Sequence, residues 1–191
     1  MSEALAYQEE HRDYELINGE VYMMARPSLD HIVIEDNITV IFKNYLQGKR
    51  CRSFSEPDVY LSETDQVIPD VVIVCNLDLL RDGRVNGAPD LIVEILSPST
   101  ARNDKLRKKA LYEKYGVKEY WIVDPLNKTI EVYHLIEGKL VLDNFYMNYN
   151  EQHLSRLNDE DKAELEANRS FKVSLYDDFT VEVADVFKGV D

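Results

Sequence analysis

The side chain with the clearest capacity for chemistry is Glu94, an acid inside the apolar run Leu91-Ile92-Val93-Glu94-Ile95-Leu96. Side chains alternate across a strand, so Glu94 would share one face with Ile92 and Leu96. A strand that is apolar on both faces is usually covered on both sides. A carboxylate buried there needs a metal ion, a cation or a raised pKa to compensate for lost hydration. The alternative is a structural pairing with a lysine, or a position at an exposed strand end.

Asp70 is the second candidate, because it follows Pro69 and opens the apolar run 71–75. A Pro-Asp step is also common in turns, and Pro57-Asp58 repeats it, so the dipeptide alone indicates little. The informative feature is the pair of acids, one at a strand start and one inside a neighbouring apolar strand. Two hard carboxylates suit Mg²⁺, which proteins hold with one or two carboxylates plus waters and substrate phosphate oxygens. Such an ion would activate water and neutralise charge on a phosphate.

A lysine on the expected helix 101–115 is the third candidate. Residues four apart lie on one helix face, so Asp104, Lys108 and Tyr112 form a stripe. Apolar residues of the same helix border this stripe, so Lys108 is expected to point inward, where it needs an acidic partner such as Glu94. The alternative is a surface pair between Asp104 and Lys108, worth only a few tenths of a kcal/mol.

Turn residues and hydrophobic spacing predict the elements that carry the first candidates. Residues 14–26 are typical of a hairpin, because Asn18-Gly19 suits the two positive φ angles of a type I′ turn. Residues 29–47 place apolar side chains at three- and four-residue steps, which predicts a helix. Three short strands are then expected at 51–55, 58–61 and 71–75, and a loop is expected at 76–89.

The second half of the chain predicts a strand, a helix and a further strand. The strand 91–96 is followed by hydroxyl residues that could cap a helix in Ser97-Pro98-Ser99-Thr100, and the helix 101–115 is expected to end at Gly116. A strand at 119–124 would then be parallel to the first, because a helical crossover joins parallel strands. The remaining elements expected are a hairpin of 129–136 with 139–147 and a polar surface helix or insertion at 151–169.

Length and charge limit the range of functions. The 191 residues suit one domain with a substantial core, and 45% are hydrophobic. The net charge of −14 should repel phosphate. Residues 151–191 hold eleven acidic against five basic residues, whereas residues 102–118 hold seven basic against two acidic residues. This basic helix is only weak support for nucleic-acid binding, because a solvated helix face explains most of its lysines equally well.

The two cysteines and the N-terminus favour a cytoplasmic protein. The two cysteines, Cys51 and Cys75, are too few for a disulfide framework and form no metal-binding motif. Cys75 lies in an apolar run that is typical of a core. The N-terminal residues have no basic segment followed by an apolar stretch, so no secretory signal is expected. No apolar run approaches the ~18 residues that span a bilayer. A reducing cytoplasm is the economical placement.

Several segments carry a likeness to a known family: Glu15-Leu16-Ile17-Asn18-Gly19-Glu20, Pro69-Asp70, Asp90-Leu91-Ile92-Val93-Glu94-Ile95-Leu96-Ser97-Pro98-Ser99-Thr100, Asp104…Lys108…Tyr112 and Gly116-Val117-Lys118-Glu119-Tyr120-Trp121-Ile122-Val123-Asp124-Pro125. In these segments the chain resembles the Uma2 family, bacterial proteins described as restriction-endonuclease-like members of the PD-(D/E)XK nuclease superfamily. The likeness extends over residues 11–147. Its most specific part is the block that surrounds Glu94.

The resemblance implies a restriction-endonuclease-like α/β core, with a mixed central sheet flanked by helices and an N-terminal hairpin. It also implies Asp70 as the motif aspartate and Glu94 as the second acid, which together would hold Mg²⁺ or Mn²⁺. The superfamily's lysine normally stands two residues after the second acid, where this chain has Leu96. Families of this kind are thought to move the lysine to the following helix, where Lys108 occupies the matching position.

Three further assignments come from the resemblance. Glu20 matches a family acid in the N-terminal hairpin and is expected to complete the catalytic set. His31 matches a recurrent histidine at a helix start, and a helix-capping or core role is an equal alternative. Residues 148–170 resemble an acidic surface insertion within a single domain of residues 1–191.

These features together predict a metal-dependent endonuclease that hydrolyses phosphodiester bonds, with DNA as the expected substrate and RNA not distinguished from it. A homodimer is expected, because cutting both strands of a duplex takes two sites and closed two-fold dimers are the commonest assembly. The alternative is a catalytically inactive nuclease fold kept as a binding or regulatory module. The net charge favours the alternative, and the combination of Asp70, Glu94 and Lys108 favours the enzyme.

Overall fold

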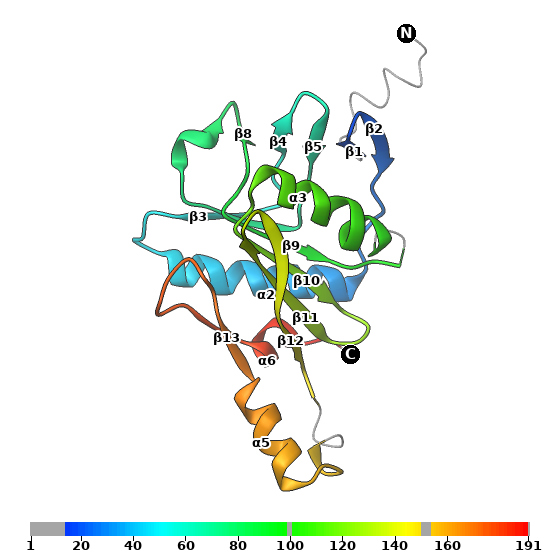
Figure 1. The fold of residues 1–191 in the computed structure, drawn as a ribbon, viewed down its shortest axis with the longest axis vertical. Coiled ribbons are helices and arrows are strands. Elements are labelled where there is room, and N and C mark those ends of the chain that lie inside the picture. The colour runs from blue at the N-terminus through cyan, green and yellow to red at the C-terminus, as the bar shows by residue number, and fades with distance from the viewer. Residues whose placement is uncertain (1–13, 99–100, 150–153, 191) are drawn as a thin grey trace.

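A mixed six-stranded sheet forms the centre of the protein (Figure 1). The computed structural model describes residues 14–98, 101–149 and 154–190. Along the sheet the strand order is β12-β11-β10-β9-β6-β3. In chain order the strands are β3 (Arg52–Ser55), β6 (Val71–Val74), β9 (Leu91–Ile95), β10 (Glu119–Asp124), β11 (Thr129–Ile136) and β12 (Lys139–Met147). The expected α/β fold with a mixed central sheet is confirmed.

Strands β9 and β10 are parallel, and their register pairs Glu94 with Ile122. In the helical segment between them, residues 101–102 are α-helical, the π-helix η2 (Asn103–Lys108) follows, and α3 (Lys109–Tyr115) completes it. The predicted helix is therefore present, but its first half has a wider turn than an α-helix. Gly116 ends it in the left-handed region, at φ 80°. The hydroxyl cap candidates Ser99 and Thr100 lie outside the described residues.

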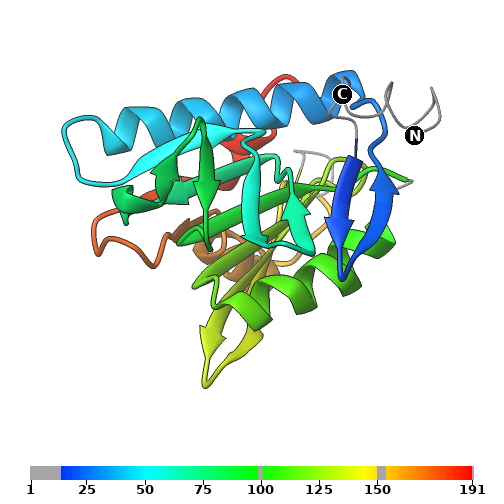
Figure 2. The same ribbon diagram turned by 90° about the horizontal axis from the view of Figure 1, so that it is seen from above.

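Helices cover the two faces of the central sheet, and Figure 2 shows α2 and α3 on opposite sides of it. The long helix α2 (Leu29–Leu46) begins after Ser28, whose Oγ accepts a hydrogen bond from the His31 backbone N–H. It packs on the face formed by the odd-numbered residues of β9, whereas α3 packs on the face that carries Ile92. Both faces of β9 are buried, as the apolar run predicts.

A second six-stranded sheet has the order β2-β1-β5-β4-β8-β7 and shares the α3-side core. The predicted hairpin is present, with both turn residues, Asn18 and Gly19, at positive φ. Residues 76–89 are more ordered than the expected loop: they form the 3₁₀ turn η1 (Leu77–Leu79) and a short hairpin whose Asp82-Gly83 turn is itself a hairpin signal. The strands are β1 (Tyr14–Ile17), β2 (Glu20–Met23), β4 (Val59–Ser62), β5 (Asp65–Val67), β7 (Leu80–Arg81) and β8 (Arg84–Asn86).

The C-terminal part returns to the α2 face. A small hairpin of β13 (Ser170–Lys172) and β14 (Thr180–Glu182) leads into the short helix α6 (Val183–Val186), and their apolar residues join the α2-side core. Before them, α5 (Asp159–Ala167) projects from the body with exposed acidic residues (Figure 1). The surface helix expected within 151–169 is thus present, apart from residues 151–153, which lie outside the described residues.

The cysteines differ from the expectation, which took two cysteines as too few for a disulfide framework and Cys75 as a core residue. Cys51 and Cys75 form a disulfide, with their Cα atoms 4.0 Å apart. They come together because β3 and β6 are antiparallel and pair Arg52 with Val74, which places the two adjacent cysteines opposite each other. Within the described residues, no helix combines the length and hydrophobicity needed to cross a bilayer.

Candidate active site

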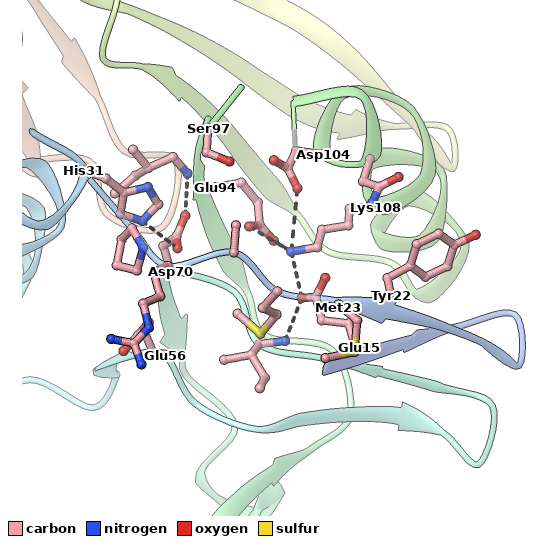
Figure 3. A pocket seen from close by; sticks show the side chains of 17 residues that line it. Glu15, Tyr22, Met23, His31, Glu56, Asp70, Glu94, Ser97, Asp104 and Lys108 are labelled. Carbon is pink, nitrogen blue, oxygen red and sulfur yellow. Dashed lines mark hydrogen bonds and ion pairs between the residues drawn. The ribbon is translucent and has the colours of Figure 1, made fainter. Parts of the chain in front are cut away.

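Asp70, Glu94 and Lys108 meet in one buried pocket, although they come from three different elements (Figure 3). Asp70 stands just before β6, Glu94 lies in β9, and Lys108 ends η2. Residues from β1, from the start of α2 and from the segment between β2 and α2 complete the wall. The pocket has a volume of about 60 Å³, enough for an ion with a few waters.

Lys108 lies among three carboxylates. Its Nζ is 2.7 Å from Glu15 Oε1, 3.1 Å from each Glu94 oxygen and 3.6 Å from Asp104 Oδ1. Burial alone lowers the pKa of a lysine, but the charges of these carboxylates outweigh burial, so the Lys108 pKa lies well above its usual value. The inward orientation expected from the helix pattern is confirmed, and Lys108 carries its positive charge at physiological pH.

Glu94 is the most strongly perturbed acid of the pocket. Its side chain is 3% exposed, and it accepts a hydrogen bond from the Tyr112 hydroxyl at 2.5 Å. Burial raises the pKa of Glu94 well above its usual value; Lys108 opposes the rise, and the neighbouring charges of Asp104, Asp70 and Glu15 add to it. Lys108 does not fully compensate for burial and for the neighbouring negative charges, so Glu94 loses its proton less readily than an ordinary glutamate.

Asp70 has both carboxylate oxygens engaged. Oδ2 accepts from the Ile95 backbone N–H at 2.5 Å, and Oδ1 is 3.0 Å from His31 Nε2. The first contact follows from the antiparallel pairing of β6 with β9. This pairing places Val71 opposite Val93, so Asp70, one residue before Val71, lies beside the end of β9. His31 thus contacts the site with its ring while its backbone N–H joins the helix cap.

The hairpin supplies Glu15 to the pocket and not Glu20. Glu20 is exposed on the edge strand β2, accepts a hydrogen bond from the Tyr22 hydroxyl and is not among the pocket-lining residues. The structure therefore does not bring Glu20 together with Asp70, Glu94 and Lys108. Glu15 is 5% exposed and also accepts from the Ile68 backbone N–H. The sequence could have indicated that Glu15 is buried, because Glu15 stands two residues before the apolar Ile17 and residues two apart share a strand face.

The basic residues around this helix are largely neutralised by the body of the protein. Lys105 pairs with Glu131, Lys114 with Asp65 and Lys118 with Asp90, at 2.6–3.0 Å. Lys109 donates to a backbone carbonyl oxygen in β12. Three lysines of the basic stretch 102–118 are therefore held in partly exposed ion pairs with other elements, which reduces the positive charge that this stretch offers to a polyanion.

The donor set of the pocket fits a hard divalent cation. In the described ranges, no group of three or more His, Cys, Asp and Glu residues already has metal-binding geometry. Mg²⁺ does not require such a group, because one or two carboxylates plus water and substrate oxygens are its usual ligands. Asp70 and Glu94 face the same pocket, and the surplus of buried carboxylates over Lys108 is a charge imbalance that a cation relieves.

A mixed sheet with one acid before a strand, a second acid inside the next strand and a lysine from the following helix is the arrangement that the resemblance to restriction-endonuclease-like proteins implied. The family model of Uma2, described as "Putative restriction endonuclease", matches residues 1–168. This chain belongs to the Uma2 family. The match extends beyond the resemblance seen over 11–147 and reaches the end of α5.

One curated protein and one solved structure are similar to this chain. The chain is 30% identical over 136 residues to the uncharacterized protein slr1290 of Synechocystis sp. (strain ATCC 27184 / PCC 6803 / Kazusa). The matched region covers 69% of this chain and 72% of slr1290. A "putative nuclease belonging to DUF820" from Anabaena variabilis ATCC 29413 has a similar crystal structure, with a TM-score of 0.63 at 18% identity. That likeness covers 91% of this chain and 89% of the other, and it shows a shared fold.

Proposed function

We propose that this protein is a Mg²⁺-dependent endonuclease that hydrolyses phosphodiester bonds in DNA. The observation that carries the proposal is the convergence of Asp70, Glu94 and Lys108 on one pocket with an excess of buried negative charge. Family membership supports it. Asp70 and Glu94 would hold Mg²⁺, with Mn²⁺ as a substitute, and the bound ion supplies Lewis-acid chemistry and a more acidic water.

The surrounding groups keep the two carboxylates in place. The Ile95 N–H and the His31 ring hold Asp70 from two sides, and Tyr112 and Lys108 hold Glu94. Such support fixes ligand orientation before substrate arrives, which is where much of an enzyme's electrostatic stabilisation originates. Lys108 would position the attacking water or stabilise the negative charge that develops on the phosphate.

The second candidate function is a nuclease fold that binds nucleic acid or a partner without cleaving. The net charge of −14 and the ion pairs formed by the basic helix favour it, because both weaken attraction for a polyanion.

A dimer is part of the first proposal, the endonuclease, since the pocket of each protomer would cut one strand of the duplex.

Cleavage of plasmid DNA by the parent and by three variants tests the proposal. Asp70→Asn keeps an acceptor for the Ile95 N–H but removes the charge, so cleavage should be lost. Lys108→Met should slow cleavage about a hundred- to a thousand-fold, the cost of removing a preorganised group that stabilises the transition state. Lys105→Met is the matched control, because it removes the same charge from an exposed pair with Glu131, and its modest effect should fade with added salt.

Two further measurements separate chemistry from folding. Mn²⁺ titrated calorimetrically should bind the parent and Lys105→Met, but not Asp70→Asn. Melting in EDTA identifies variants that lose structure, which matters for Lys108→Met because it leaves three buried acids without their cation. A parent that binds DNA and cuts none with either metal would favour the binding module. Equal losses in the two lysine variants would contradict a catalytic role for Lys108.

A further inference from the structure

The pocket that holds the acids adjoins a larger cavity of about 640 Å³. The two share one wall, whose residues are Met24, Ala25, Arg26, Pro27, Glu56 and Ile68. The larger space falls in the size range of pockets that hold small organic ligands, and the smaller one admits only an ion and waters. A substrate group that reaches Asp70 and Glu94 through the larger cavity must therefore pass this wall.

Arg26 lies in the part of the wall that joins β2 to α2. Residues 24–28 have no regular secondary structure, and the helix starts only after Ser28. Pro27 explains why, because proline disfavours a helical conformation of the residue before it, which is Arg26. Arg26 is exposed and lines both cavities. An exposed arginine outside regular secondary structure can turn toward a ligand without disturbing the core.

The other cations that line these cavities are already engaged. They are His31, whose ring contacts Asp70, and Lys108, whose ammonium lies among three carboxylates. By contrast, no described residue forms a hydrogen bond or ion pair with the Arg26 side chain. Among the described lining residues, Arg26 is thus the cation that can meet an incoming anion without first giving up an acidic partner.

We infer that Arg26 binds the phosphate backbone of the substrate at the entrance and directs a phosphodiester toward Asp70 and Glu94. This inference rests on the proposed nuclease function. The planar guanidinium suits the role, because it can donate two parallel hydrogen bonds to one phosphate. Arg26 is needed to attract phosphate to the larger cavity, since the other charged residues described in its lining are the acids Glu56 and Asp58. Among the described residues that line this cavity, Arg26 is the one basic side chain.

The test compares Arg26→Gln with Arg26→Lys and with Arg81→Gln. Arg81 is an equally exposed arginine on β7 that lines neither cavity, so it controls for the loss of one positive charge. A fluorescein-labelled DNA oligonucleotide, single-stranded and duplex, reports binding by anisotropy in EDTA at several salt concentrations, and cleavage kinetics with Mg²⁺ report KM and kcat. Arg26→Gln should weaken binding and raise KM about ten- to a hundredfold, as expected for a charge-assisted contact, with kcat nearly unchanged.

The salt dependence and the conservative variant identify the contact. The slope of log K against log salt should fall by about one in Arg26→Gln, as for one lost phosphate contact. Arg26→Lys should recover part of the affinity, and Arg81→Gln should match the parent. A parent that cleaves while Arg26→Gln keeps its KM, or equal weakening in Arg26→Gln and Arg81→Gln, would overturn the role of Arg26 alone. A parent that neither binds nor cleaves DNA would overturn the proposed function and this inference together.

Discussion

Four buried carboxylates and one buried lysine line the pocket, and this imbalance affects the charge state of the groups in it. Glu15, Asp70, Glu94 and Asp104 are all at most 9% exposed. Like charges in a buried site cannot all ionise cheaply, so either a proton or a bound cation must compensate. The raised pKa of Glu94 is the expression of this competition in the metal-free protein. A metal that replaces the proton would release it, so metal affinity should increase with pH.

Glu35 provides a stability measurement outside the pocket. It lies one turn after His31 in α2, and burial raises its pKa to about 7, with added effects of the nearby charges of Glu56 and Asp70. A raised pKa means that the folded state binds the proton more tightly than the unfolded state. The stability contributed by this proton is therefore fully present below the ordinary value of 4.5 and is lost as the pH rises through 7.

Glu35→Gln should remove that pH dependence. The melting temperature of the variant, measured in EDTA, should rise relative to that of the parent as the pH increases from below to above 7. Asp36→Asn is the control, because it removes an acid from the neighbouring exposed position of α2. A constant difference between Glu35→Gln and the parent across this range would show that Glu35 ionises normally in the folded protein.

The helical segment after β9 positions Lys108. Its first half is a π-helix, in which Asp104 and Lys108 are both buried, and the Tyr120 hydroxyl donates to the Asp104 carbonyl oxygen at 3.1 Å. A wider turn frequently occurs at functional sites, because it redirects side chains that a regular helix would present differently. The second half, α3, is anchored by Gly116, so the end of the helix is fixed as well as its start.

Gly116→Ala tests that anchor. Gly116 has φ 80°, and a Cβ added there would meet nothing within 4 Å, so the cost is backbone strain alone. Alanine should lower the free energy of unfolding by about 1–2 kcal/mol, measured by urea denaturation. Gly116→Asn should cost less, because asparagine tolerates this conformation better. A loss from asparagine as large as that from alanine would mean that the conformation of this cap is not what limits stability.

The whole molecule places the pocket at the junction of its two sheets. The β1–β2 hairpin from the second sheet, the start of α2 and the segment η2 meet at the ends of β6 and β9 (Figures 1 and 2). The acidic C-terminal part lies on the other side of the central sheet, with α5 projecting away (Figure 1). Part of the negative charge that would repel a nucleic acid is thus carried away from the pocket.

The assembly of two protomers is a prediction at this scale. Double-strand cleavage needs two pockets, so light scattering at micromolar concentration should give twice the monomer mass. The monomer mass is 22.2 kDa. A monomer under these conditions would remove the dimer while leaving the chemistry of the pocket unaffected. In that case plasmid DNA should accumulate as nicked circles, since single-strand cuts would be independent.

Local sequence was sufficient for most of the elements and for part of the pocket. The continuous apolar run 91–96 placed Glu94 in a strand buried on both faces, and helical spacing predicted that Lys108 points inward. Turn residues located the first hairpin. These predictions succeeded because the side-chain period of a strand or helix follows from backbone geometry within a few residues.

Tertiary structure decided which of these elements meet. Glu15 entered the pocket in place of Glu20, His31 contacted Asp70, and Cys51 bonded to Cys75. Each of these contacts joins elements whose order in the sheets and register are set by packing of the whole core. Lysines of the basic stretch, which the sequence left equally explained as a solvated helix face, form partly exposed ion pairs with acids of other elements. A sequence period identifies the face of an element, and only the folded arrangement determines what that face meets.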